Sequence, residues 1–362
     1  MIKRKWSDKV SVCGIVGIPG SYGGFETLVE NLVLKSKMQF IVFVDRNFKI
    51  TRHYNNVEFV KLPFLANGLE SIIFDFFCVL ISCIKGSSAI LLLGTPGALI
   101  APLKYMFKVP IVCNIAGLEW GRSKWGFFAR LVLKSSERMA AMYSDILICD
   151  NLKLCEYVQK TYSLEPRYIA YGGDQFENVQ IDNRVFQEFD ITFSDYNFAL
   201  ARAQPDNNLE MIASAHLRAR CNIVIVTNWS NSEFGRAFYK KYNGRNIKII
   251  GPLFDKAKLK ALRASSTSYI HGHSAGGTNP ALVEAMWSGR DIIAFSNGFN
   301  EATTDYQAAY FEDELALTAI LADRCRVDGN GSQMRKIAER QYTWDSVSED
   351  YEDVLRRVAS DE

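Results

Sequence analysis

Short apolar runs alternate with helix-length segments along the first half of this chain. The apolar runs are Val10–Ile15, Phe40–Val44, Val57–Lys61, Ala89–Leu93, Ile111–Asn114 and Ile146–Cys149. The longer segments between them have helical patterns and include Phe25–Lys37, Leu69–Ile84 and Trp125–Tyr143. Strands that alternate with helices form parallel sheets whose two faces are both covered. The pattern therefore predicts an α/β fold with a doubly wound sheet.

The pattern pauses after Asp174 and then restarts. Residues 175–195 are polar and weakly periodic, as in a linker. The alternation resumes with Phe198–Ala201, Ile223–Val226, Ile247–Ile250, Tyr269–His271 and Asp291–Phe295. We predict two Rossmann-like domains, at 1–177 and 178–345, followed by a C-terminal helix at 346–362. Because ligands bind outside the carboxyl ends of such strands, the two sheet edges are expected to face a cleft.

The charges are unevenly distributed, although the formal net charge is only +2. Residues 1–177 hold 21 Lys and Arg against 15 Asp and Glu, and the remainder holds 21 against 25. A basic first half fits a domain that faces an anionic partner, although a surplus of this size also arises by chance. A nucleic acid is not among the partners that we expect.

The eight cysteines are scattered and include no Cys-x-x-Cys pair. A structural zinc site is therefore not expected, and buried thiols in a reducing cytosol are the simpler interpretation. The first apolar run, which starts at Val10, is too short for the hydrophobic region of a signal peptide. We expect a cytoplasmic chain that is neither exported nor cleaved.

Two segments, Ser71–Ile84 and Gly94–Phe107, are apolar enough to be weighed as membrane segments. A helix that spans a bilayer needs about 20 residues with almost no charge. The first segment is shorter and contains Asp75, and the second contains two prolines and Lys104. We predict helices packed on the sheet, and a face that touches lipid headgroups is the alternative.

One stretch carries recognisable chemistry. Residues 271–286 read His-Gly-His-Ser-Ala-Gly-Gly-Thr-Asn-Pro-Ala-Leu-Val-Glu-Ala-Met. A paired glycine that opens into a helix can bring backbone N–H groups against a phosphate, and the helix N-terminus adds its positive dipole end. Glu284 lies too far along the helix to meet that phosphate and is better placed to accept hydrogen bonds from sugar hydroxyls. The stretch predicts a nucleotide-sugar site, and an ordinary turn with a solvated Glu is the alternative.

Four motifs, this stretch included, carry a family resemblance. The other three are Gly14–Thr27, which is rich in glycine, Asn114–Trp120 followed by Arg122, Lys124 and Trp125, and Ile169–Asp174. In this order they resemble the family 4 glycosyltransferases, in the form seen in bacterial rhamnosyltransferases. The resemblance implies the GT-B fold, with two doubly wound Rossmann-like domains that face a cleft. It also implies that the last helix, which Tyr342–Val358 resembles, crosses back to the first domain, and a helix that caps its own domain is the alternative.

The resemblance implies roles for individual residues. The expected donor-binding residues are Gly23, Gly24, Arg202, His273, Gly276, Gly277, Thr278, Asn279 and Glu284. The expected acceptor-binding residues are Asn114, Trp120, Arg122 and Lys124, and the expected catalytic residues are Glu119 and Glu26. An aromatic ring beside a carboxylate, as at Glu119 and Trp120, is a common way to hold a sugar. Arg122 and Lys124 suit an acceptor phosphate, with ordinary surface charge as the alternative.

Some positions depart from the family pattern. Ala116 stands where related rhamnosyltransferases usually carry an Asp, whose carboxylate can align the acceptor hydroxyl or take its proton. Gly276 stands where the wider family has the first of two glutamates. Asn207 or Asn208 replaces the usual Lys partner of Arg202.

We expect no metal and no cofactor. No Asp-x-Asp signature suggests a metal that bridges the diphosphate. The helix dipole, the loop amides and Arg202 can neutralise the leaving group without one. His271 and His273 are expected to line the site or to form hydrogen bonds rather than to bind a metal ion.

The resemblance implies a transferase that moves L-rhamnose from dTDP-L-rhamnose onto a lipid-linked glycan during the synthesis of a cell-surface polysaccharide. The resemblance implies retention at the anomeric carbon. We expect a cytoplasmic location, or a peripheral one on the inner face of the plasma membrane, where the basic first domain would meet anionic lipid. Two alternatives stay open: a nucleotide-sugar 2-epimerase, and a non-catalytic sugar-nucleotide-binding partner of an active transferase, which Ala116 favours.

Overall fold

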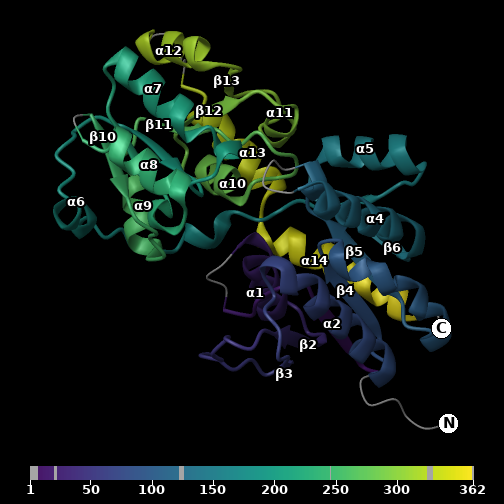
Figure 1. Cartoon of the computed structure of the whole chain (residues 1–362). Helices are drawn as coiled ribbons and strands as arrows, with labels where there is room; N and C mark the ends of the chain where they lie inside the picture. The colour runs from purple at the N-terminus through teal and green to yellow at the C-terminus, as the bar shows by residue number, and fades with distance from the viewer. Residues whose placement is uncertain (1–6, 20–22, 122–125, 245, 324–328, 361–362) are drawn as a thin grey trace. The chain divides into compact units, whose positions relative to one another are not determined.

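The computed structural model describes residues 7–19, 23–121, 126–244, 246–323 and 329–360. By its internal contacts the chain divides into two compact units (Figure 1). Unit 1 holds the residues up to Tyr171 and those from Trp344 onward, and unit 2 holds Gly172–Thr343. The chain therefore passes between the units after Tyr171 and after Thr343, where we had predicted boundaries after 177 and after 345.

Unit 1 is built on a parallel sheet. Its described strands are β1 (Lys9–Cys13), β2 (Gln39–Val44), β3 (Val57–Lys61), β4 (Ala89–Leu93), β5 (Ile111–Ile115), β6 (Ile146–Cys149) and β7 (Arg167–Tyr168). They lie in the order β3-β2-β1-β4-β5-β6-β7, and every neighbouring pair is parallel. Strands β1, β2, β4 and β5 are buried almost throughout, as expected of a sheet that is covered on both faces.

Helices cover this sheet. They are α1 (Gly24–Lys35), α2 (Ser71–Lys85), α3 (Lys104–Phe107), α4 (Phe127–Tyr143), α5 (Leu152–Tyr162) and α14 (Trp344–Ser360). The last of these, drawn in yellow in Figure 1, packs against α1 and against β4 and β5. Trp344 and Tyr351 on α14 are fully buried in the core of unit 1. The C-terminal segment is thus part of the same core as the first strand.

One apolar segment of unit 1 takes a different form from the helix that we predicted. Residues after β4 form a 3-10 helix, η2 (Pro96–Leu103), before the single turn of α3. Pro102 lies inside η2 and has no N–H to donate, so a regular α-helix through this position would lose a hydrogen bond. Asp75 on α2 is buried against η2, and burial raises its pKa to about 8.

Unit 2 repeats the plan of unit 1. Its described strands are β8 (Asn197–Leu200), β9 (Ile223–Val226), β10 (Ile247–Ile250), β11 (Ser268–His271), β12 (Asp291–Phe295) and β13 (Ala309–Phe311). Their order is β10-β9-β8-β11-β12-β13, again with parallel pairs throughout. The helices are α6 (Arg184–Glu188), α7 (Leu209–Ala219), α8 (Glu233–Tyr242), α9 (Lys256–Ala264), α10 (Pro280–Trp287), α11 (Phe299–Thr303), α12 (Glu314–Ala322) and α13 (Gly331–Gln341).

The predicted α/β class with two doubly wound sheets is confirmed. In each unit the strand order reverses once, between β1 and β4 in unit 1 and between β8 and β11 in unit 2. Strands β7 and β13 escaped prediction because each is only two or three residues long. The expected cleft between the two sheet edges stays a prediction. In the part of the chain that the structure describes, no helix is both long and apolar enough to cross a membrane.

Candidate functional site

The reversal point of unit 2 brings two of the predicted motifs together. The segment after β8 begins at Ala201, and the segment after β11 begins at Gly272. Because β8 and β11 are neighbours in a parallel sheet, both segments leave from the same carboxyl edge. Doubly wound sheets bind their ligands at this kind of position. Residues 201–208 and 272–279 are therefore the first candidates for a site.

The two segments are joined by direct hydrogen bonds. They link His273 Nδ1 with Asn207 Oδ1 (2.8 Å), Ser274 N with Asp206 O (2.8 Å), and Asn208 Nδ2 with Gly272 O (2.9 Å). From the other side, the side chains of Asn297 and Asn300 both donate to the backbone oxygen of His273, at 3.0 and 2.9 Å. The candidate loop is thus held in place by its surroundings before any ligand binds.

The network assigns the protonation of His273. The Asn207 amide nitrogen donates to Arg202 O at 2.9 Å, so its oxygen faces the imidazole. An amide oxygen can only accept, and Nδ1 of His273 must therefore carry the proton in this arrangement. In a neutral imidazole, Nε2 of His273 is then the hydrogen-bond acceptor. Asn207 thus fixes both His273 and the backbone at Arg202, whose own side chain is exposed.

The glycines of the 272–279 loop allow neighbouring groups to approach the backbone closely. A Cβ on Gly272 would lie 2.3 Å from Asn207 O and 2.7 Å from a methyl carbon of Ile212, so only glycine allows the two segments to approach. A Cβ on Gly276 would lie 2.7 Å from the ring of Phe299. Gly277 has a φ of +103°, which is a region that favours glycine.

Asn279 caps the helix that follows the loop. Its side chain accepts a hydrogen bond from Ala281 N at 3.0 Å, and Pro280 takes the first helical position of α10. This structural role accounts for the residue without a ligand. Because α10 starts directly after the glycines, its positive dipole end still faces the loop.

Glu284, one turn further along α10, is already engaged with neighbouring side chains. Its Oε1 accepts from Gln175 Nε2 at 2.7 Å, and its Oε2 accepts from Arg263. The Arg263 side chain is only 4% exposed and lies over the ring of Phe176, 4.7 Å from its centroid. Each carboxylate oxygen can accept a second hydrogen bond, so Glu284 keeps capacity for a hydroxyl. Neither Gln175 nor Arg263 belongs to a motif that sequence reasoning singled out.

In unit 1, the glycine-rich segment lies at the corresponding reversal point. A Cβ on Gly14 would lie 2.0 Å from Leu93 O at the end of β4, and its φ is +96°. Gly23 and Gly24 lie at the start of α1. Glu26 is buried and accepts a hydrogen bond from Val16 N at 3.1 Å. The structure thus gives Glu26 a role in holding the segment, and the catalytic role that we predicted for it stays a prediction.

The predicted acceptor residues Asn114, Trp120, Arg122 and Lys124 and the predicted catalytic residue Glu119 all follow or end strand β5 in the sequence. Asn114 is fully buried and donates to the hydroxyl of Tyr351 on α14, so the structure gives it a place in the core, and its role in acceptor binding stays a prediction. Glu119 and Trp120 form a short 3-10 turn after β5 and are partly exposed. Arg122 and Lys124 lie outside the described residues. Ala116 is partly exposed at the carboxyl end of β5.

Trp120 is held by a carboxylate that the sequence did not reveal. Its Nε1 donates to Glu137 Oε2 at 2.9 Å, and Lys134 Nζ lies 4.7 Å from the Trp120 ring centroid. Glu137 is buried on α4 and also accepts from the hydroxyls of Tyr157 and Tyr162, each at 2.7 Å. Burial and this carboxylate raise the pKa of Tyr157 to about 12, so the tyrosine stays protonated as a donor.

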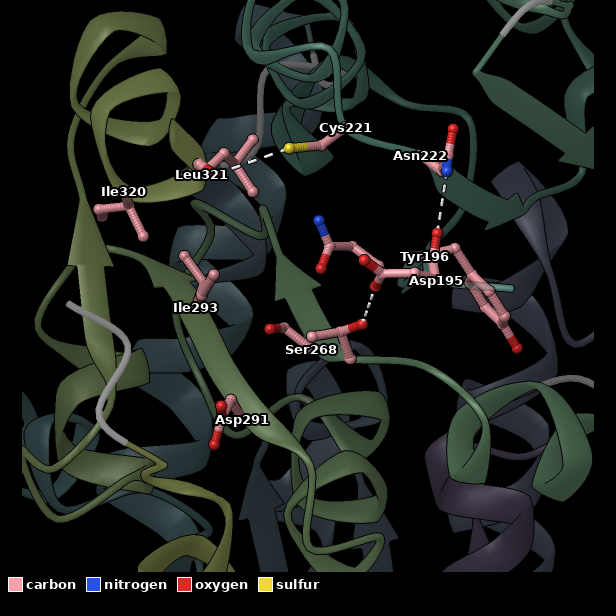
Figure 2. A pocket seen from close by; sticks show the side chains of 11 residues that line it. Asp195, Tyr196, Cys221, Asn222, Ser268, Asp291, Ile293, Ile320 and Leu321 are labelled. Atoms are coloured by element: carbon pink, nitrogen blue, oxygen red, sulfur yellow. Dashed lines mark hydrogen bonds between the residues drawn. The ribbon is translucent and has the colours of Figure 1, made fainter. Parts of the chain in front are cut away.

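A separate pocket lies at the opposite edge of the unit 2 sheet (Figure 2). Its lining includes Asp195, Asn197, Ser268 and Asp291, which stand at or just before the first residues of β8, β11 and β12. The Asn222 side chain donates to Asp195 O at 3.0 Å. Ligands of doubly wound sheets bind at the carboxyl ends, and this pocket is at the amino ends. We therefore do not assign the site to it.

Two buried histidines of unit 2, His216 and His271, are expected to destabilise the chain in acid. Burial lowers the pKa of His216 to about 4 and that of His271 to about 3, from an ordinary value of 6.5. Below pH 6.5 the unfolded chain therefore binds protons that the folded chain does not. The contribution to stability is complete above that pH and falls by about 1.4 kcal/mol per pH unit for each histidine as the pH drops towards the folded pKa.

Urea unfolding at about pH 7.5 and about pH 5.5 measures this loss. His271→Gln should reduce the pH dependence of the free energy of unfolding by roughly the contribution of one histidine. An equal pH dependence in the variant and the parent protein would contradict the assignment of a neutral, buried His271.

We compared the sequence and the structure of this chain with those of known proteins. A family model described as a domain of unknown function, DUF1972, matches residues 7–174. No curated protein matches the sequence. The chain is similar to the sucrose-phosphate synthase of Thermosynechococcus elongatus, with 14% identity and a TM-score of 0.81 over 98% of this chain and 100% of that one.

Two further solved structures show the same likeness. HepE from Anabaena, solved in complex with UDP and glucose, has 14% identity and a TM-score of 0.74, over 96% of this chain and 99% of its own. WaaG, a glycosyltransferase involved in lipopolysaccharide biosynthesis, has 16% identity and a TM-score of 0.71 over the same shares. At these identities the likeness establishes the fold. With its two doubly wound parallel sheets, this chain has the GT-B fold of the glycosyltransferases.

Proposed function

We propose that the chain is a glycosyltransferase that binds a nucleotide sugar at the carboxyl edge of unit 2. The observation that carries the proposal is the hydrogen-bonded pair of segments at the reversal between β8 and β11. Arg202 lies in the first segment, and Glu284 lies on α10, which follows the second. The GT-B neighbours support it, since HepE was solved with UDP and glucose. In the proposed complex the diphosphate meets the 276–278 amides, the start of α10 and the Arg202 guanidinium.

Transfer in this site needs charge stabilisation more than a strong base. As the bond from the anomeric carbon to the diphosphate oxygen breaks, its electron pair goes to the leaving group, and the sugar gains oxocarbenium character. Arg202 and the helix dipole stabilise the negative charge that develops. The acceptor hydroxyl bonds to the anomeric carbon and gives its proton to the diphosphate. With Ala116 in place of the family Asp, the leaving group is the base that we propose.

The finer assignment follows the sequence resemblance. We propose L-rhamnose from dTDP-L-rhamnose as the donor, retention at the anomeric carbon, and a lipid-linked glycan as the acceptor. Trp120, which Glu137 holds, and Glu119 would form the acceptor surface on unit 1. A nucleotide-sugar 2-epimerase would need acid and base groups around the donor sugar itself. A non-catalytic binding partner would bind the donor without turnover.

The donor assignment predicts selective thermal stabilisation. A ligand that binds only the folded chain contributes about 2.7 kcal/mol at 100 times its Kd, so dTDP-L-rhamnose should raise the melting temperature by several degrees within a panel of nucleotide sugars. Arg202→Gln should weaken the donor about tenfold or more without loss of stability, since this side chain is exposed. Arg220→Gln is the matched control, because Arg220 is also exposed but precedes β9 at the amino edge.

The outcomes separate the candidates. A rise in melting temperature with a different nucleotide sugar would be consistent with a transferase but would overturn the assignment of rhamnose as the donor sugar. Release of nucleoside diphosphate only when a lipid-linked acceptor is added would exclude the epimerase. Binding without release on any acceptor would favour the non-catalytic partner. No shift with any nucleotide sugar, or equal effects of Arg202→Gln and Arg220→Gln, would count against the proposed donor site.

A further inference from the structure

Helix α4 of unit 1 presents large apolar side chains to solvent. Phe127 and Phe128 at its start are 77% and 79% exposed, and their rings pack edge to face with centroids 5.6 Å apart. Leu131, Val132 and Met142 further along the helix are also exposed. We call these five residues the α4 face. Aromatic and aliphatic side chains of this size are rarely grouped on a surface without a partner.

The α4 face is not the packing side of the helix. The buried side of α4 consists of Leu133, Ser136, Glu137, Ala140 and Ala141. In helical geometry these positions follow one another around the opposite side from Phe127 and Leu131. Figure 1 shows α4 beside β5 and β6 in unit 1. The core of unit 1 is therefore complete without the α4 face.

The exposed charged side chains of α4 itself are all positive. Arg130, Lys134 and Arg138 are exposed along one flank of it. The single carboxylate in α4, Glu137, is buried and accepts hydrogen bonds from Trp120, Tyr157 and Tyr162. An apolar strip with a cationic border and no exposed carboxylate is the composition of helices that lie in the interface of an anionic membrane.

The apolar surface continues beyond α4. Tyr105 and Met106 on α3 are among the most exposed large apolar side chains of the described chain. The Tyr105 ring meets that of Tyr143, the last residue of α4, edge to face at 6.2 Å between centroids. The next residue after α3, Lys108, is also exposed. Two elements thus supply one surface of the same chemistry.

We propose that the α4 face docks unit 1 onto an anionic lipid surface. The phenylalanines and Leu131 enter the boundary between headgroups and acyl chains, and Arg130, Lys134 and Arg138 meet lipid phosphates. Charge complementarity favours lipid over a second copy of the chain, because the exposed charges of α4 are cations only. Of the two segments that we had weighed for lipid contact, 71–84 and 94–107, α2 and η2 pack on each other, whereas Tyr105 and Met106 at the end of the second segment belong to this exposed surface. The inference goes beyond the proposed transfer reaction and does not depend on it.

Vesicle flotation of the whole chain, without any sugar or nucleotide, tests the proposal. The chain should float with vesicles of phosphatidylglycerol and phosphatidylcholine, and much less with phosphatidylcholine alone. Phe127→Ser with Phe128→Ser should lower the partition coefficient at least about tenfold, because two large side chains leave the lipid. Lys134→Gln with Arg138→Gln should lower it about fivefold for each charge and should remove much of the salt dependence.

Matched controls come from unit 2. Phe254 and Leu315 are 70% and 67% exposed, and Phe254→Ser with Leu315→Ser should leave flotation unchanged. Equal flotation of the α4 variants and the parent protein, or an equal loss in the unit 2 controls, would overturn the proposal. So would a change of oligomeric state in the Phe127 and Phe128 variant with no vesicle binding in the parent. Melting temperatures with nucleotide sugar, measured on the same variants, show separately whether the donor site is intact.

Discussion

Glu284→Ala should lower the free energy of unfolding of unit 2 by about 3–5 kcal/mol, because it leaves a buried guanidinium without its counter-charge. Arg263 is 4% exposed, and Glu284 supplies its carboxylate partner. Two further guanidinium nitrogens of Arg263, Nε and Nη1, are buried without a hydrogen-bond partner. The alanine variant therefore leaves the charge of Arg263 unpaired in a guanidinium that is already poorly solvated.

Urea unfolding of three variants resolves the origin of this loss. Glu284→Gln keeps an oxygen for Arg263 and should cost clearly less than Glu284→Ala. The double change Glu284→Met with Arg263→Met removes both charges at similar volume and should also cost less. A Glu284→Ala variant as stable as the parent would contradict the buried ion pair. For donor binding, Glu284→Gln is consequently the better test, because loss of binding in Glu284→Ala would be confounded with unfolding.

Gly272→Ala should damage the candidate site more than any other single methyl group added there. The new Cβ would lie 2.3 Å from Asn207 O, a backbone atom that cannot rotate away. The 201–208 and 272–279 segments must then separate, and the bond between Asn208 and Gly272 O is strained. Overpacking of this kind costs about 1–3 kcal/mol of stability. A displacement near 1 Å at a reacting centre lowers turnover on the order of a hundredfold.

Gly251→Ala is the matched control for this substitution. Gly251 also follows a strand, β10, but the nearest atom to a Cβ there is Trp229 Nε1 at 3.9 Å. Urea unfolding and nucleotide-sugar binding should both be close to those of the parent in Gly251→Ala and clearly reduced in Gly272→Ala. Similar results for the two variants would show that close approach of the segments does not matter for the site.

The fold was predictable from the sequence because the strands are short, apolar and separated by helices. Strands β3, β4, β6, β9, β10 and β12 have the predicted bounds. The misses have local causes: β7 and β13 are too short to show periodicity, and Pro102 prevents a regular helix in η2. The strand order in each sheet, with its reversal between β1 and β4 or between β8 and β11, depends on tertiary packing and cannot be predicted from any one segment.

The candidate site was only partly predictable. Glycine motifs marked the loops at the reversal points, since close approach leaves a composition signal at positions such as Gly14 and Gly272. The residues that hold Glu284 and Trp120 in place have no such signal in the sequence. Arg263 lies in the last turn of α9 and Glu137 lies within α4, and they contact Glu284 and Trp120, which are distant in the sequence. Asn114 looked available from its motif, but its side chain turns into the core.

The division of the chain also has a consequence for its biosynthesis. Unit 1 needs α14, whose Trp344 packs on Tyr171 with ring centroids 4.8 Å apart, and α14 is made last. All of Gly172–Thr343 is therefore translated between the two parts of unit 1, which takes roughly 10–30 s at about 5–20 residues per second. During that interval the α14-facing side of α1, β4 and β5 has no cover, whereas unit 2 is continuous and can fold as it emerges. Nascent unit 1 is consequently the part that would engage a holdase chaperone.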